Sequence, residues 1–377
     1  MFSPDFISLL EESVGDHAGT VLEALEEEPS VSIRLNPSRL DACPFEEATP
    51  VGWSPYGYLL KERPNFTLDP LFHAGGYYVQ DSSAMFVGTL LRKIIGGLSP
   101  GVKVLDLCAA PGGKTTDAAA SLREAFGERF SLLANEVVRK RFSVLRSNVR
   151  TWGDERVGVV RRDPSAFGDE PVFDVILADV PCSGEGMFRK DSKAVEDWSI
   201  DTVRLCAARS RRILSDIWPT LREGGWLIYS TCTFNHFEND DTAEWIAESL
   251  GAGIVDLGKI APAVRTRAGY ALLPGLVPGE GQWAAVLRKN GYGMAPGDVF
   301  RLFKAEVPTE KLSDYPCFEL GREDALKYLH GDALRLEGAP LGMLTLCYRG
   351  LPLGCGKNLG SRCNNLYPKD RRIRMDV

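Results

Sequence analysis

The chain has 377 residues, of which 44% are hydrophobic and 25% are charged, and its formal net charge is −7 at pH 7. This length is enough for two or three domains with cores of their own, and the composition is that of an ordinary globular protein. No apolar run reaches the roughly 18 residues that a membrane-spanning helix needs. The acidic start, MFSPDFISLLEES, lacks the basic segment of a signal peptide. We therefore expect a cytoplasmic protein without membrane segments.

The cysteines carry information on the compartment. There are nine of them, an odd number, and no two form a Cys-x-x-Cys pair. Four scattered histidines add no spacing that is typical of a metal site. This pattern argues against a disulfide framework and a zinc site, and it favours a reducing compartment. We expect free thiols and no metal ion.

The net negative charge hides a gradient along the chain. Residues 1–40 contain two arginines and eight acids, residues 137–162 contain eight Lys or Arg and two acids, and residues 350–377 contain six and two. Local basic patches attract a polyanion such as RNA even when the total charge is negative. A solvated helix face and a basic tail would explain the same pattern from charge alone.

The first hundred residues predict a mixed region. Residues 1–30 fit acidic helices, and residues 49–80 fit short strands and loops rich in Pro, Gly and aromatic side chains. Residues 81–98 have apolar side chains at helical spacing, an Asp or Ser cap and a Gly-Gly stop.

From residue 102 onward, strands alternate with helices. The expected strands are 102–108, 130–136, 156–160, 172–180, 225–231, 253–257 and 282–288, and the expected helices are 113–125, 138–150, 199–216 and 239–249. This alternation predicts an α/β fold, a parallel sheet with helices on both faces. Ligands bind such sheets at the C-terminal ends of the strands. A Gly- and Pro-rich linker at 289–298 precedes about 80 residues, enough for a small separate domain.

The stretch VLDLCAAPGGKTTDAA (104–119) runs from a strand through a glycine turn into a helix, an arrangement that cradles nucleotides. Its Gly-Lys-Thr ending is similar to a phosphate loop for ATP or GTP. That loop requires a glycine where this chain has Cys108. The strand-end Asp179 could still hold magnesium, so an ATPase remains an alternative.

S-adenosylmethionine is the competing ligand, and two acids favour it. Glu136 lies at the end of the second strand, 30 residues after Asp106, where an acid can bind both ribose hydroxyls. Asp163, just past the third strand, could accept a hydrogen bond from the adenine amino group. Both acids would equally fit a role as plain helix caps.

Two cysteines follow strands of the same predicted sheet. Cys182 lies in ADVPCSGEGMFRKD (178–191), and Cys232 lies in IYSTCTFNHFEND (228–240). A single strand-end cysteine is usually a small inert hydrophobe. Two of them beside a cofactor turn suit methylation of carbon 5 of a pyrimidine, in which a thiolate adds to carbon 6 and an acid such as Asp179 stabilises charge near N3. From the residues alone, either cysteine could be the nucleophile.

These stretches resemble the Sun/Nop family of RNA cytosine-5 methyltransferases, most closely its bacterial RsmF-like branch, which acts on small-subunit ribosomal RNA. The matching stretches are RLNP, FHAGGYYVQDSSAM, DLCAAPGGKTT, NEVVRKR, LADVPCSGEGMFRKD, YSTCTF and GEGQWAAVLRK. PLGCGKNLGSRCNNLYPKD (352–370) is similar to the C-terminal PUA-like module of that branch. The resemblance covers nearly the whole chain and departs from the family pattern at Asp81, His236-Phe237 and Cys355.

The resemblance implies a Rossmann-like class I S-adenosylmethionine-dependent methyltransferase with a mostly parallel seven-stranded sheet. It implies an N-terminal RNA-recognition region (1–98), a methyltransferase domain (99–289) and a C-terminal PUA-like α+β module (290–377). The implied reaction is methylation of carbon 5 of a cytosine in RNA, expected to be 16S rRNA, through a covalent Cys–cytosine adduct. A transfer RNA substrate and a non-catalytic RNA-binding protein are the alternatives. We expect a monomer.

The resemblance also assigns the site residues. Cys232 matches the nucleophile, Cys182 the residue that helps to release the product, and Asp179 the acid that holds the cytosine. The residues expected to bind S-adenosyl-L-methionine are Cys108, Ala109, Ala110, Pro111, Gly112, Lys114, Glu136, Arg141, Asp163 and Asp179. The residues expected to bind the RNA substrate are Lys190, Arg189 and Gln80. Base stacking or an ordinary core role would both suit Tyr77, Tyr78 and Phe188.

Overall fold

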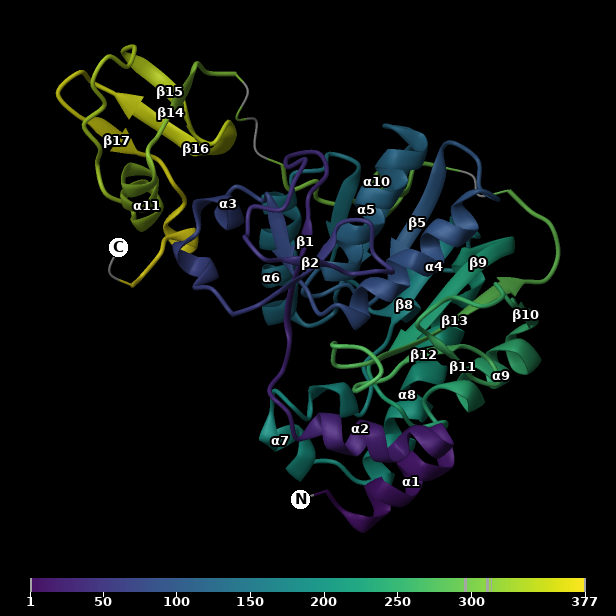
Figure 1. The fold of residues 1–377 in the computed structure, drawn as a ribbon. Helices are drawn as coiled ribbons and strands as arrows, with labels where there is room; N and C mark the ends of the chain where they lie inside the picture. Colours follow the sequence, from purple (N-terminus) through teal and green to yellow (C-terminus); the bar gives the residue numbers. More distant parts are fainter. Residues whose placement is uncertain (1, 295–296, 310–311, 313, 376–377) are drawn as a thin grey trace.

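The computed structural model describes residues 2–294, 297–309, 312 and 314–375. Within these residues, nine strands form the central sheet in the order β11-β12-β13-β9-β8-β5-β6-β7, with β10 paired to β13 (Figure 1). The strands are β5 (Val102–Asp106), β6 (Phe130–Asn135), β7 (Val157–Val160), β8 (Phe173–Asp179), β9 (Leu221–Thr231), β10 (Ala252–Ile254), β11 (Val264–Arg265), β12 (Tyr270–Leu272) and β13 (Gln282–Lys289).

Strands β5 to β9 are parallel, whereas β13 pairs antiparallel with β9. The parallel strands are near-continuous apolar runs, because helices cover both of their faces. This confirms the expected α/β fold with a mostly parallel sheet.

The expected number of seven strands differs from the structure. The segment predicted as a strand at 253–257 pairs only with the C-terminal end of β13, while β12 occupies the sheet position next to β13. The hairpin of β11 and β12 was not predicted, because strands of two and three residues are too short to show a periodicity.

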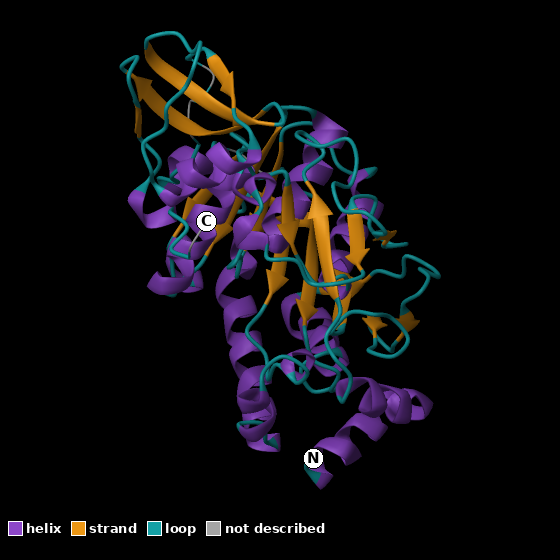
Figure 2. Ribbon diagram, turned by 60° about the vertical axis from the view of Figure 1, so that its left-hand side comes forward, coloured by secondary structure: helices purple, strands orange, loops and turns teal. Residues whose placement is uncertain are grey.

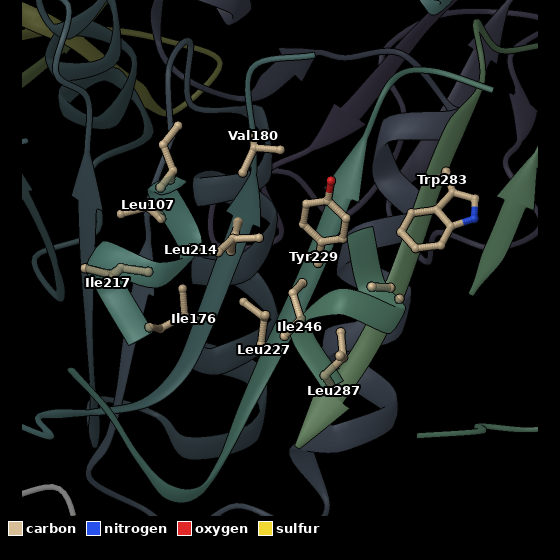
Figure 3. Packing of buried hydrophobic residues seen from close by; sticks show 14 of the residues in the cluster. Leu107, Ile176, Val180, Leu214, Ile217, Leu227, Tyr229, Ile246, Trp283 and Leu287 are labelled. Carbon is tan, nitrogen blue, oxygen red and sulfur yellow. The ribbon is translucent and has the colours of Figure 1, made fainter. Parts of the chain in front are cut away.

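Two layers of helices enclose the sheet (Figure 2). One face packs against α4 (Phe86–Ile95), α5 (Gly113–Phe126) and α6 (Arg139–Trp152). The other face packs against α8 (Ile200–Ile217) and α9 (Asp240–Leu250). In Figure 3, Ile176 and Leu227 of the sheet meet Leu214 of α8 and Ile246 of α9.

The N-terminal helices α1 (Pro4–Val14) and α2 (Ala18–Leu25) join the core on the α8 side of the sheet, near the short helix α7 (Ser192–Glu196). Pro at the first position and a Ser3 cap explain why α1 begins at residue 4. The helices expected within residues 1–30 are confirmed.

A second, smaller sheet has the order β2-β3-β1-β4, from β1 (Val31–Leu35), β2 (Thr49–Pro50), β3 (Gly57–Leu60) and β4 (Tyr77–Val79), with α3 (Pro70–His73) beside it. The C-terminal sheet contains β14 (Cys317–Glu319), β15 (Gly342–Tyr348), β16 (Leu351–Asn358) and β17 (Cys363–Asn365), and it packs with α11 (Arg322–His330). These two sheets share one hydrophobic cluster, so the C-terminal module sits on the N-terminal sheet, far from α1 and α2 (Figure 1).

Cys317 and Cys347 form a disulfide bond between β14 and β15, with their Cα atoms 6.3 Å apart. The expectation of free thiols alone is therefore wrong for this pair. A cysteine count does not reveal that two strands 30 residues apart pair in parallel. No helix of the described residues is long and apolar enough to span a membrane.

The segment after β13 returns to the central sheet before the C-terminal module begins. The predicted linker at 289–298 includes residues 295 and 296, which lie outside the described residues. Helix α10 (Val299–Phe303) follows it, and the Phe303 ring lies 4.9 Å from that of Phe167 and 5.6 Å from that of Phe173. This helix thus belongs to the packing of the central sheet.

Replacing Phe303 with Ala should destabilise the protein by about 3–5 kcal/mol, because it leaves a cavity beside two aromatic rings. Replacing Leu302, its exposed neighbour, with Ala should change the free energy of unfolding by less than about 0.5 kcal/mol. Urea unfolding of both variants measures the difference. Equal effects would contradict the packing of α10 described above.

Candidate active site

Parallel strands β5, β6, β8 and β9 end at one edge of the central sheet and bring the predicted site residues together. Asp106 ends β5, Asp179 ends β8, and Thr231 ends β9 next to Cys232. Asn135 ends β6 and ties this edge together, since its side-chain amide donates to the carbonyls of Leu107 (3.0 Å) and Arg162 (3.1 Å).

The glycine turn connects β5 to α5. Gly112 precedes the helix with φ of 113°, a backbone conformation that favours glycine. The Ala109 N–H donates to the Asn135 carbonyl (2.8 Å), and the Asn148 side chain of α6 donates to the Pro111 carbonyl (2.8 Å). The turn is therefore held from two sides, and α5 begins directly after it.

The first residues of this turn lie in a buried, acidic environment. Burial raises the pKa of Asp106 to about 7, although a hydrogen bond from the Thr115 hydroxyl (2.6 Å) opposes the shift. Burial and the neighbouring Asp106 raise the pKa of the Cys108 thiol. Cys108 is therefore a neutral thiol in this turn.

Glu136 and Arg141 form a unit above the turn. Glu136 is 3% exposed, and its Oε1 accepts a hydrogen bond from the Val138 N–H (2.8 Å). Its Oε2 accepts no hydrogen bond within the described residues and lies 3.4 Å from Nη1 of Arg141. Arg141 also donates to the Ala110 carbonyl (2.7 Å). The pair thus leaves a buried carboxylate oxygen available to a ligand hydroxyl.

Asp163 is exposed and caps a short helical turn. Its carboxylate accepts from the Ser165 N–H (3.1 Å) and hydroxyl (2.7 Å), and these bonds lower its pKa. The cap that the sequence left open as an alternative is therefore present. The cap uses only Oδ1 of Asp163.

Lys114 and Asp179 form an ion pair in the site, with Nζ 2.9 Å from Oδ2. Burial alone would lower the pKa of Lys114, but Asp179 and, to a smaller extent, Cys232 raise it above its usual value. The Ser230 hydroxyl donates to Oδ1 of Asp179 (2.8 Å), and the Gln282 amide lies 3.3 Å from the same oxygen. Asp179 is about one-third exposed and is held at the edge of the site.

The two predicted cysteines lie side by side. The Sγ atoms of Cys182 and Cys232 are 3.4 Å apart, and both residues are partly exposed. The hydrogen bond to Cys232, followed by burial, raises the pKa of Cys182 well above its usual range. Cys182 is therefore the thiol of the pair.

Two buried carboxyls, Glu185 and Glu238, fasten the loops that carry the cysteines. The Glu185 carboxylate, from the Cys182 loop, accepts from the N–H groups of Phe234 (2.6 Å) and Asn235 (3.1 Å) in the Cys232 loop. Glu238, from the Cys232 loop, accepts from the Ser183 N–H (3.0 Å) in the Cys182 loop. Each loop thus supplies an acceptor for the other.

Burial of these two carboxyls disfavours their ionised form. Burial raises the pKa of Glu238 to about 7, and Glu185 adds to the shift. Burial also raises the pKa of Glu185, opposed by its hydrogen bonds. Neither carboxyl can be identified from the sequence, because polar residues in a predicted loop do not show which of them become buried.

The predicted substrate residues divide into two groups. Lys190 is one-third exposed, with Nζ 3.2 Å from Glu280. Arg189 is 4% exposed and binds Glu280 (2.6 Å) and the Gly279 carbonyl (2.8 Å). Gln80 is 7% exposed and accepts from Arg34 (2.9 Å). Arg189 and Gln80 therefore lie behind the surface that a substrate would reach.

The aromatic residues considered for stacking also differ. Tyr77 and Phe188 are buried in hydrophobic clusters, so both have the ordinary core role. Tyr78 is half-buried, and its hydroxyl accepts from the Asn148 side chain (3.2 Å).

Replacing Glu238 with Gln should change how stability depends on pH. A carboxyl with a pKa of about 7 in the folded state, against the usual 4.5, binds its proton more tightly when the protein is folded. The wild type therefore loses stability as pH rises from about 4.5 to about 7, by up to about 1.4 kcal/mol per unit of pKa shift, and is level above that.

Glu238→Gln lacks this loss, so its stability relative to the wild type should increase across the same window. Urea unfolding between about pH 5 and about pH 8 measures it. Glu11→Gln, at an exposed position of α1, is the control and should follow the wild type. Parallel curves for Glu238→Gln and the wild type would contradict the buried carboxyl.

Comparison with known proteins gives three family matches. Residues 97–252 match the model described as 16S rRNA methyltransferase RsmB/F, residues 2–82 match the N-terminal domain of 16S rRNA methyltransferase RsmF, and residues 315–373 match the methyltransferase RsmF PUA domain.

Among solved structures, a methyltransferase homologue from Pyrococcus horikoshii is 25% identical, with a TM-score of 0.63 over 76% of this chain and 95% of that chain. NSun6 from Pyrococcus horikoshii, solved with SFG, is 17% identical with a TM-score of 0.62 over 77% and 99%, which shows the shared fold.

Among curated proteins, ribosomal RNA small subunit methyltransferase F of Escherichia coli O9:H4 (strain HS) is 34% identical over 69% of this chain and 57% of its own length. The protein of that name from Aliivibrio salmonicida is 31% identical over 81% of this chain and 68% of its own length. The chain thus spans little more than half of the Escherichia coli relative. Its sequence, fold and site place it in the RsmF family of ribosomal RNA small subunit methyltransferases.

Proposed function

We propose that this protein methylates carbon 5 of a cytosine in RNA, with S-adenosyl-L-methionine as the methyl donor and 16S rRNA as the substrate. The observation that carries the proposal is the pair of sulfur atoms 3.4 Å apart, next to the Lys114–Asp179 ion pair. The names of the relatives support the choice of 16S rRNA.

In this proposal, residues 1–98 and 290–377 bind RNA and residues 99–289 carry the chemistry. The enzyme acts as a monomer in the cytoplasm. Its chemistry requires no metal ion, because Lys114 supplies a fixed positive charge within the site.

The residues at the strand edge fit S-adenosyl-L-methionine. The buried Oε2 of Glu136, which accepts no hydrogen bond, suits a ribose hydroxyl. Gly112 gives the turn its shape, because its φ of 113° disfavours a side chain and a Cβ there would come within 3.3 Å of Leu145 in α6. The residues proposed to hold the cofactor are Cys108, Ala109, Ala110, Pro111, Gly112, Lys114, Glu136, Arg141, Asp163 and Asp179.

When bound, S-adenosyl-L-methionine supplies an electrophilic methyl group to carbon 5 of the cytosine. Cys232 prepares that carbon, because its thiolate forms a bond to carbon 6 and makes carbon 5 nucleophilic. A free cysteine is only a few per cent thiolate at pH 7. The Lys114 ammonium, paired with Asp179, supplies a positive charge within the same site.

Asp179 faces the N3 edge of the cytosine and, as a carboxylate, accepts a hydrogen bond from the proton that N3 takes up when the thiolate adds to carbon 6. Its carboxylate is positioned by Lys114 on one oxygen and by Ser230 on the other, so it faces the site in a fixed orientation. Lys190, at the rim, is placed to contact the RNA backbone. Arg189 and Gln80 support this rim and the glycine turn from beneath. A cytosine within a helix cannot expose carbon 6, so the target base is unpaired or flipped.

Cys182 releases the product. After methylation, the proton on carbon 5 passes to a solvent base, its electron pair forms the double bond between carbon 5 and carbon 6, and the bond between carbon 6 and Cys232 breaks, so that Cys232 leaves as a thiolate. The raised pKa of Cys182 keeps it protonated. Its S–H can therefore stabilise the departing sulfur 3.4 Å away.

Cys232→Ala should abolish methylation, because the other thiol of the site, Cys182, has a raised pKa and stays protonated. The measurement uses methyl-labelled S-adenosyl-L-methionine with small-subunit particles or their RNA, followed by digestion to nucleosides. Label should appear in 5-methylcytidine with the wild type and with Cys43→Ala, a control away from the site. Label only with transfer RNA would contradict the ribosomal substrate, and substantial activity of Cys232→Ala would contradict the nucleophile.

Cys182→Ala should accumulate a covalent protein–RNA complex, since Cys232 still attacks but its departure is no longer assisted. Denaturing gel electrophoresis with labelled RNA detects the complex as a shifted band. The double variant Cys182→Ala/Cys232→Ala is the control and should show no band. Turnover at the wild-type rate without a complex would show that Cys182 has another role.

A further inference from the structure

A cavity of about 280 Å³ lies where three parts of the molecule meet, outside the site described above. Tyr77 and Tyr78 come from β4 of the N-terminal sheet, Trp152 comes from the end of α6, and Tyr367 and Arg371 come from the C-terminal segment. None of the cysteines or strand-end acids of the active site lines it.

The walls of this cavity are fixed aromatic side chains. Tyr77 is 2% exposed, and its hydroxyl donates to Asp69. Trp152 is 5% exposed, and the Arg34 guanidinium lies over its ring, 4.7 Å from the ring centre. These two rings are buried and keep the wall rigid, whereas the half-buried ring of Tyr78, which also lines the cavity, is the face on which an unpaired base can stack, whatever the identity of the base.

The cavity also offers hydrogen-bond donors and acceptors. Burial raises the pKa of Tyr78 to about 12, against the opposing effects of Arg34 and Asn148, so Tyr78 keeps its hydroxyl proton. Its oxygen accepts from Asn148, which leaves the O–H to donate elsewhere. His73 contacts the Thr67 carbonyl through Nε2 (2.8 Å), so Nε2 carries the proton and Nδ1 is an acceptor. A mixed set of this kind suits the edge of a nucleobase.

The charge around the cavity complements a polyanion. Helix α6 carries five Lys or Arg side chains, and the C-terminal segment carries four, at positions 139, 140, 141, 146 and 150 and at 369, 371, 372 and 374. Arg371 lines the cavity together with Asp370, and it bonds to Thr151 of α6 (2.9 Å), so it links the two groups. A phosphate backbone that follows both groups would pass over the opening of the cavity.

We propose that this cavity receives one unpaired base of the RNA substrate and so anchors the RNA away from the target cytosine. The proposal rests on the proposed function in taking RNA as the substrate. The cavity is also tied to the cofactor turn, since Asn148 donates both to Tyr78 and to the Pro111 carbonyl. An anchored base therefore lies one side chain away from the turn that precedes α5.

Ser147→Phe tests the proposal by filling the cavity from α6 without removing a charge. Ser143→Phe is the matched control, because Ser143 is exposed on the same helix one turn earlier and does not line the cavity. We expect Ser147→Phe to weaken binding of in vitro transcribed 16S rRNA about tenfold, as loss of one stacked base would. Ser143→Phe should bind like the wild type. Equal affinities of the two variants would overturn the proposal.

A second measurement uses the unmodified protein. The same RNA, transcribed with 4-thiouridine and irradiated on the full-length chain, should crosslink to peptides containing residues 72–79 or 147–152. Crosslinks at other peptides alone would also overturn the proposal, as would a free nucleoside monophosphate that fills the cavity while RNA binding is unchanged. Both readouts are binding measurements without methyl transfer, so failure of the proposed function in the methylation assay is separable from failure here.

Discussion

The geometry of the site depends on the reciprocal bonds of two buried carboxyls. Glu185 lies in the Cys182 loop and accepts a backbone N–H of the Cys232 loop, and Glu238 lies in the Cys232 loop and accepts a backbone N–H of the Cys182 loop. The side-chain amide of Asn235 donates to both carboxyls (2.8 and 2.9 Å). These bonds fasten two loops 50 residues apart in sequence whose sulfur atoms lie in contact, together with the bond from the Gly186 N–H to the Cys232 carbonyl (2.7 Å). Burying carboxyls is unfavourable, and the raised pKa of each is the measure of that cost.

The edge of the sheet imposes the second constraint. Asp179 and Cys232 follow neighbouring parallel strands, so both must emerge at the same end. Lys114 begins the helix after the glycine turn and reaches across the strand ends to Asp179. A single cation thus connects the turn proposed for the cofactor with the acid proposed for the base. The same sheet explains why residues from separate segments of the chain lie together at one site.

The sequence was sufficient for the alternation of strands and helices and for the residues at the strand ends, because both follow from local pattern and from the rule that parallel strands end together. It was not sufficient for groups whose role depends on long-range packing. Arg189 has the charge expected of an RNA contact, but its guanidinium is bound to the Glu280 carboxylate and to the carbonyls of Pro278 and Gly279. Glu185 and Glu238 resemble solvated loop acids in sequence. The β11–β12 hairpin and the Cys317–Cys347 bond depend on pairings that no periodicity reveals.

Arg34 shows how the N-terminal sheet is joined to the site. Its side chain is fully buried. It donates to the Gly113 carbonyl (3.2 Å) and to the Thr116 hydroxyl at the start of α5. Its ring contact with Trp152 connects the same side chain to α6. The C-terminal module packs on this N-terminal sheet, so the sheet lies in contact with the module on one side and, through Arg34, with the start of α5 on the other. Direct side-chain contacts therefore join the parts proposed to hold RNA to the turn proposed to hold the methyl donor.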